Sequence, residues 1–117
     1  MPPRDWRARL DDMVQAAERA LGYVQGLTYE QFAADLKTID AVSYAIVVIG
    51  EAASALKDVG PKLAPELPWA DVRGMRNRVA HEYFGVDVKV LWETVREDLP
   101  SLLTELRAAL ARASDLP

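Results

Sequence analysis

Apolar residues recur at three- and four-residue steps along most of the chain, which is the spacing of one face of an α-helix. No stretch alternates polar and apolar residues between turn residues, so the sequence contains no strand signal. The spacing predicts a first helix over about residues 4–23, with Gly26 as its stop. The apolar face of this helix consists of Trp6, Leu10, Met13, Ala17, Leu21 and Val24.

A second helical region begins at Thr28, which together with Gln31 forms a capping-box pattern. We expect a short helix that continues or kinks near Asp35 into a long helix ending near Asp58. Two apolar stripes predict that the long helix is buried on two sides, and the alanines of the second stripe allow a neighbouring helix to approach closely. The stripes are Ile39, Val42, Ile46, Ile49, Ala53 and Leu56, and Ala41, Ala45, Val48, Ala52 and Ala55.

A third, more polar stripe of the long helix contains Glu51 in an otherwise apolar setting. One interpretation is an exposed carboxylate on the solvent side. The other is a carboxylate that orients a basic group from another helix. The stripe consists of Asp40, Tyr44, Val47, Glu51 and Ser54.

The rest of the chain is predicted to contain a loop and further helices. Three prolines and a glycine between residues 59 and 69 predict a loop. Pro68 can occupy the first turn of the next helix, which should end near Gly85. Asp87 can cap a further helix, and Pro100 ends that helix or bends it into a last one. Antiparallel helices with short connections predict an all-α, up-and-down four-helix bundle with additional short helices.

Composition is consistent with one soluble domain over residues 1–117. The chain has no cysteine, which excludes disulfides, thiol nucleophiles and cysteine-based metal sites and fits a cytoplasmic location. The longest apolar run, residues 45–50, is far shorter than the roughly 18 residues needed to cross a bilayer. The first ten residues lack the hydrophobic region of a signal peptide. We therefore expect no membrane segment.

The net charge of −4 makes the chain a poor non-specific nucleic-acid binder, so any nucleic-acid site must be a local basic patch. The alternative interpretation of each arginine cluster is a solvated helix face. The tightest cluster is Arg73, Arg76 and Arg78, and the second is Arg4, Arg7 and Arg9.

The densest polar chemistry lies in "MRNRVAHEYFGVD", residues 75–87, which holds the single histidine. Arg76 and His81 are separated by about 140° around a straight helix, whereas Arg76 and Tyr83 share a face, as do Asn77 and His81. For Arg76 and His81 to act on one phosphate, the helix must deviate near its end, the side chains must reach round, or a second chain must supply one of them.

These residue types suit phosphodiester cleavage in RNA. Arginine binds phosphate oxygens with a planar fork of donors, histidine moves a proton near neutral pH, and RNA supplies its own 2′-hydroxyl nucleophile. No metal is required. One histidine for two proton transfers favours a symmetric dimer. The spacing alone also fits a structural histidine, a Tyr83 that packs at the core boundary, and an Asn77 that holds its helix against a neighbour.

"GMRNRVAHEYFGVD" resembles the signature of the HepT-like toxins within the HEPN superfamily, in which arginine, four residues, histidine, one residue and tyrosine follow in order. Here that pattern falls on Arg76, His81 and Tyr83. The resemblance covers about residues 4–103. It includes "RDWRARLDDM", "DLKTIDAV", "IGEAA", "PWADVRGMRN" and "VLWETVREDLP".

The resemblance implies an HEPN-like homodimer that acts as a metal-independent endoribonuclease toxin without a cofactor, with catalytic Arg76 and His81 in a cleft at the dimer interface. In this type VII-like toxin–antitoxin arrangement, a minimal nucleotidyltransferase antitoxin silences the toxin by transferring AMP from ATP to Tyr83. Transfer RNA is one kind of RNA target in the family. The supporting or RNA-binding residues would be Asn77, Arg73, Arg78 and Glu51. Tyr44 and Lys37 depart from a basic residue and an arginine common in the family, which bears on RNA binding.

Two other functions also fit the sequence. A non-catalytic nucleotide-binding or scaffold bundle would bind a nucleotidyltransferase without turning over RNA. A purely structural bundle would tolerate replacement of every motif residue.

Overall fold

The computed structural model describes residues 6–82 and 87–113, with side chains described for 6–77 and 87–113. Within these ranges the regular secondary structure is entirely helical, which confirms the predicted all-α class. The elements are α1 (Trp6–Val24), α2 (Tyr29–Ala33), α3 (Leu36–Ala55), α4 (Gly60–Leu63), α5 (Trp69–Glu82), α6 (Val88–Glu93), the π-helix η1 (Thr94–Asp98) and α7 (Leu99–Ala113).

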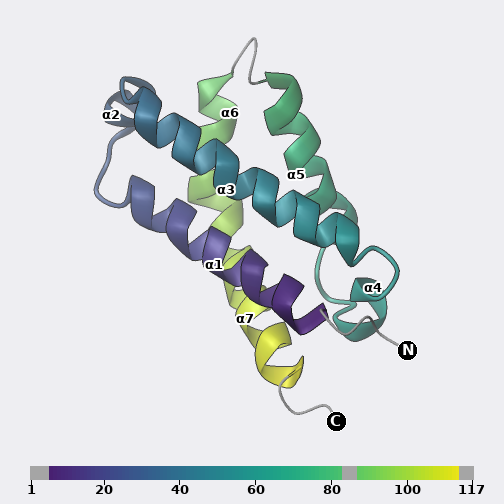
Figure 1. Cartoon of the computed structure of the whole chain (residues 1–117). Helices are drawn as coiled ribbons and strands as arrows, with labels where there is room; N and C mark the ends of the chain where they lie inside the picture. The colour runs from purple at the N-terminus through teal and green to yellow at the C-terminus, as the bar shows by residue number, and fades with distance from the viewer. Residues whose placement is uncertain (1–5, 83–86, 114–117) are drawn as a thin grey trace.

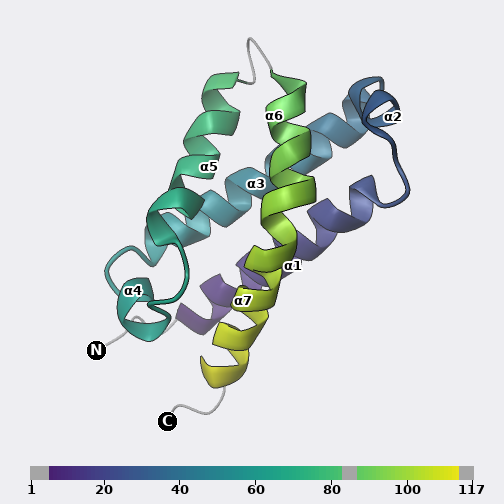
Figure 2. The same ribbon diagram turned by 180° about the vertical axis from the view of Figure 1, so that it is seen from behind.

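Helix α3 is the centre of the arrangement. It packs against α1 along one side and against α5 along another (Figure 1). The view from behind shows α6, η1 and α7 following one another as a single rod that crosses α1 and α3 (Figure 2). Every long helix therefore contacts α3 or α1, and α3 is the element that can bring residues of different helices together.

The turns before α3 form as the sequence predicts. Gly26 adopts a left-handed backbone with φ of 78°, which suits a residue without a Cβ atom at the end of α1. The amide of Gln31 donates to the Thr28 hydroxyl at 3.1 Å, and the amide of Thr28 donates to the Gln31 side chain at 2.9 Å, completing the capping box. Asp35 separates α2 from α3 and caps α3. Because α3 ends at Ala55, it is shorter than predicted.

The prediction of a loop throughout residues 59–69 is wrong, because α4 forms within it. Pro61 lies in the first turn of α4, where its missing N–H costs nothing. A Cβ atom on Gly60 would come within 2.6 Å of the Trp69 ring, so only glycine permits this contact. The indole N–H of Trp69 donates to the carbonyl of Ala64 at 2.8 Å. These contacts fix the start of α5, which begins just after Pro68.

Asp87 caps α6 as predicted, since its carboxylate accepts from the amides of Lys89 at 3.1 Å and Val90 at 3.3 Å. The alternative in which Pro100 ends a helix is wrong. The chain passes from α6 to α7 through η1, in which the amide of Leu99 donates to the carbonyl of Thr94 five residues earlier. Pro100 has no amide hydrogen and its ring conflicts with a regular preceding turn, so the wider π turn accommodates it within a continuous rod.

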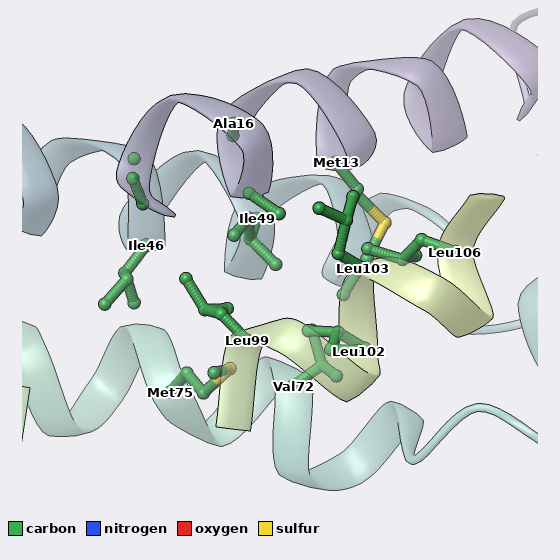
Figure 3. Packing of buried hydrophobic residues seen from close by; sticks show 14 of the residues in the cluster. Met13, Ala16, Ile46, Ile49, Val72, Met75, Leu99, Leu102, Leu103 and Leu106 are labelled. Carbon is green, nitrogen blue, oxygen red and sulfur yellow. The ribbon is translucent and has the colours of Figure 1, made fainter. Parts of the chain in front are cut away.

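The core lies between α1, α3, α5 and α7, and Figure 3 shows apolar side chains from all four helices meeting there.

The second apolar stripe of α3 is only partly buried: Ala45 and Ala52 are buried, whereas Ala55 is exposed. By length and composition α3 could cross a bilayer, but half of the relevant stretch is buried within the protein. Partial burial of this kind is typical of a helix that packs in a protein core. The residues labelled in the figure are Met13, Ala16, Ile46, Ile49, Val72, Met75, Leu99, Leu102, Leu103 and Leu106.

Candidate functional site

Arg76 lies where α5 comes closest to α3. A Cβ atom on Gly50 would be only 2.4 Å from the Cβ atom of Arg76, so the missing side chain is what allows this approach. The sequence analysis did not identify Gly50 as a site residue. The available signal was a glycine inside a long helix, where it costs about 1 kcal/mol relative to alanine and calls for a packing reason.

An ion pair fixes the direction of the Arg76 side chain. Its Nη1 donates to Glu51 Oε1 at 2.7 Å, and its Nη2 donates to Asn77 Oδ1 at 3.2 Å. Glu51 therefore contacts a basic group from another helix, as one of its two interpretations requires. The carboxylate is also exposed, so the two interpretations are not exclusive. A guanidinium has five N–H donors, and these two bonds leave donors for a ligand.

The ion pair remains accessible to solvent. The side chain of Arg76 is 37% exposed and that of Glu51 is 58% exposed. Exposed pairs of this kind contribute only about 0–1 kcal/mol to stability, because water screens the charges and ordering two long side chains costs entropy. The arrangement thus holds a cation at a defined, reachable position while adding little to the stability of the fold.

The other predicted site residues are placed to different extents. Arg73 is half-buried on α5, one turn before Arg76, and Asn77 is exposed. The side chains of Arg78 and His81 lie outside the described residues, as does all of Tyr83. The backbone of α5 is a regular α-helix through Glu82, so the positions of Arg76 and His81 keep the angular separation expected of a straight helix. For Arg76 and His81 to contact the same phosphate, their side chains must therefore reach around the helix, or a second chain must supply one of them.

A groove of about 640 Å³ flanks α5 but is unsuited to phosphate. Asp71, Asp98 and Glu105 lie along it, and one carboxylate oxygen of Glu105 is buried without a hydrogen-bond partner among the described residues. Three carboxylates repel an anion. Neither Arg73 nor Arg76 lines this groove, so the groove is separate from the Arg76–Glu51 pair.

Across the part of the chain that the structure describes, no group of three or more histidine, cysteine, aspartate or glutamate residues is placed to hold a metal ion.

The helical fold and the exposed arginine between two helices define an all-α protein with a cationic inter-helix site. Residues 13–109 match the model of the family described as "Ribonuclease HepT-like". The chain therefore belongs to the HepT-like ribonuclease family, within the HEPN superfamily to which its sequence signature pointed.

Several curated proteins are similar to the chain over most of their length. "Probable ribonuclease HepT" of Thermococcus cleftensis is 41% identical over 99 residues, which cover 85% of this chain and 90% of that protein. A Methanocaldococcus jannaschii protein whose name describes an inferred RNase, MJ1380, is 32% identical over 91% of this chain and 97% of its own length. A similarly named Caldanaerobacter subterraneus protein, TTE0752, is 30% identical over 91% and 95%. No solved structure matches the chain.

Proposed function

We propose that this protein is a metal-independent endoribonuclease toxin of a type VII-like toxin–antitoxin system, acting in the cytoplasm on RNA. One observation carries the proposal: in a HepT-like chain, the motif arginine is held by Glu51 in an exposed position where two helices meet. Arg76 would bind the scissile phosphate and stabilise the phosphorane. His81 would take the proton from the 2′-hydroxyl or give one to the leaving 5′-oxygen. The products would be a 2′,3′-cyclic phosphate and a 5′-hydroxyl.

The proposed active form is a homodimer, because one histidine in each chain cannot readily serve as both acid and base. The outer face of α3 supports a second copy as its occupant. Leu36 and Tyr44 are large hydrophobic side chains of α3 that are 75% and 70% exposed, and Tyr44 shares the stripe of Glu51, two helical turns before it. Covering this face would bring a second protomer beside the Arg76–Glu51 pair. Sedimentation of Leu36→Asp, which should be monomeric and inactive, tests this assembly.

Silencing would follow from AMP transfer to Tyr83 by a minimal nucleotidyltransferase. Tyr83 follows Arg76 by seven residues, the spacing at which two residues of one helix share a face. A phosphate attached there would pair with the arginine and exclude the phosphate of the substrate. Tyr83→Phe should remain active in the presence of ATP and the partner enzyme, and intact mass should show one AMP added to the wild-type chain alone.

Cleavage of RNA in excess EDTA is the direct test of the nuclease. The purified protein should cut RNA, and Arg76→Ala or His81→Ala should reduce the rate at least about 100-fold. Arg107→Ala is a matched control, because Arg107 is a surface arginine paired with Glu18 at 3.8 Å. Full activity of the His81 variant would overturn the proposal. Tight binding of the nucleotidyltransferase without RNA turnover would indicate the non-catalytic module instead.

A further inference from the structure

A cluster of aromatic rings and cations joins α2 to the rod formed by α6 and η1. The Tyr29 and Trp92 rings meet edge to face with centroids 6.1 Å apart, and Phe32 packs on Trp92 at 5.2 Å. Phe32 is completely buried, whereas Tyr29 and Trp92 are half-buried. Phe32 therefore anchors α2, and the other two rings extend the contact to the surface.

Two exposed cations lie over these surface rings. The Lys89 ammonium is 5.6 Å from the centroid of Tyr29, and the guanidinium carbon of Arg96 is 5.2 Å from that of Trp92. Within residues 6–77 and 87–113, neither cation forms an ion pair. We call Tyr29, Lys89, Trp92 and Arg96 the aromatic–cation cluster.

The cluster lies on the flank of α6 away from the motif helix. Both views show α6 between α5 and α2 (Figures 1 and 2). Helix α6 begins at Val88, six residues after α5 ends at Glu82. A strand of RNA with its scissile phosphate at α5 can thus continue past the end of α6 and reach α2.

We propose that the aromatic–cation cluster is a stacking subsite for unpaired bases of the RNA on one side of the scissile phosphate. This inference rests on the proposed ribonuclease function and adds the part of the substrate that this site recognises. Aromatic rings and guanidinium planes stack on any base whose face is open, which selects single-stranded RNA over duplex. Arg96 already lies on Trp92, and its outer face offers the next layer to a base.

Stacking, rather than phosphate neutralisation, should dominate at this subsite. Glu93 and Glu97 are both exposed. Glu93 lies between the two cations, four residues after Lys89 and three before Arg96, and Glu97 directly follows Arg96. These carboxylates lower the local positive potential and make a site for phosphate alone unfavourable. Binding to the cluster should therefore depend less on salt than typical phosphate-driven RNA binding.

The test uses single-stranded RNA substrates that carry flanks of increasing length. The wild-type KM should fall as the flank lengthens and reaches the cluster. In Lys89→Ala/Arg96→Ala, KM for the long substrate should rise about tenfold with kcat nearly unchanged, which corresponds to the loss of one stacked base. Lys57→Ala/Lys62→Ala removes the same charge from exposed sites at the α4 end and should retain the wild-type dependence on flank length.

Tryptophan fluorescence provides a readout that does not require cleavage. Trp6 and Trp69 are 5% and 6% exposed, so quenching by an uncleavable 2′-O-methyl strand should come mainly from Trp92. The quenching should disappear in Trp92→Phe and weaken in Lys89→Ala/Arg96→Ala. Duplex RNA should quench less than the single strand.

The failure of this inference and the failure of the nuclease are distinguishable. If wild type cleaves RNA but Lys89→Ala/Arg96→Ala matches the charge control in KM and in quenching, the subsite is wrong and the nuclease stands. If no RNA is cleaved yet single strands still quench Trp92, the subsite stands as a binding surface and the nuclease falls. Equal quenching by duplex and single strand would also contradict the stacking subsite.

Discussion

The two sides of α3 are packed by different chemistry. Every buried residue of α1 is apolar, and Ala16, Ala17 and Ala20 are completely inaccessible to solvent. On the α5 side, the closest approach instead places Gly50 against the charged Arg76. Both interfaces bury apolar side chains, including Val72 and Met75 of α5, but the α5 interface also holds a guanidinium that stays exposed.

This difference separates stability from chemistry within one helix. Burial of apolar side chains provides most of the free energy that holds the bundle together. The Arg76–Glu51 pair provides little of it, because both side chains are more than a third exposed. Substitutions in the apolar core should therefore mainly change the free energy of unfolding, whereas substitutions at the Arg76–Glu51 pair should mainly change the rate of RNA cleavage.

The largest expected effect on stability comes from the apolar core. Leu106→Ala removes a completely buried side chain that meets Met13 of α1 (Figure 3), and should lower the free energy of unfolding by about 2–5 kcal/mol. The rate of RNA cleavage per folded molecule should not change. Urea denaturation and activity at the same temperature measure both, with half-buried Leu110→Ala expected to lose less stability. A large fall in kcat would show that core and site are coupled.

Gly50→Ala should affect both stability and activity. The added methyl group cannot fit 2.4 Å from the Arg76 Cβ atom, so α5 must shift, at a cost of about 1–3 kcal/mol. Cleavage should fall because the shift moves Arg76. Gly74→Ala is the control within α5: its Cβ atom would meet nothing within 4 Å, and the helix should gain up to about 1 kcal/mol. Equal effects of the two substitutions would remove the role given to Gly50.

Most of the fold could be predicted from sequence because it depends on local signals. The Thr28 capping box, the Asp35 and Asp87 caps and the left-handed Gly26 are decided by a few neighbouring residues. The formation of α4 could not be predicted, because it depends on Trp69 packing over Gly60 from another part of the chain.

Only part of the candidate site could be predicted from the sequence. The motif identifies Arg76, and the setting of Glu51 suggested a basic partner from another helix. The spacing within one helix could not show that Gly50 brings α3 and α5 together, since that requires the register between two helices. For the same reason, the position of Lys89 over Tyr29 could not be predicted from two separate segments.

Glu51→Gln should give a small effect on stability and a clear effect on catalysis. The free energy of unfolding should change by less than about 1 kcal/mol, because the pair is exposed. The kcat should fall about tenfold, because the guanidinium loses its orienting charge, whereas KM should not rise, because phosphate no longer competes with a carboxylate. Glu18→Gln disrupts a comparable surface pair with Arg107 and should leave both constants unchanged. A rise in KM at constant kcat would instead make Glu51 a residue that binds substrate.

The smallest effect should come from Asp35, at the end of α3 and outside both interfaces. The side-chain hydrogen bond from Thr38 and then the Thr38 amide lower the pKa of the Asp35 carboxyl. A carboxyl with a lowered pKa in the folded state stabilises the protein above its unfolded pKa, and this contribution is lost as pH falls through the folded pKa. Asp35→Asn keeps a capping side chain without the charge. Its urea midpoint should therefore lie slightly below that of wild type at pH 7 and should approach it only as the pH falls through the lowered pKa of Asp35, where both caps become neutral. Parallel midpoints across this range would show that hydrogen bonding alone, without charge, makes Asp35 the cap of α3.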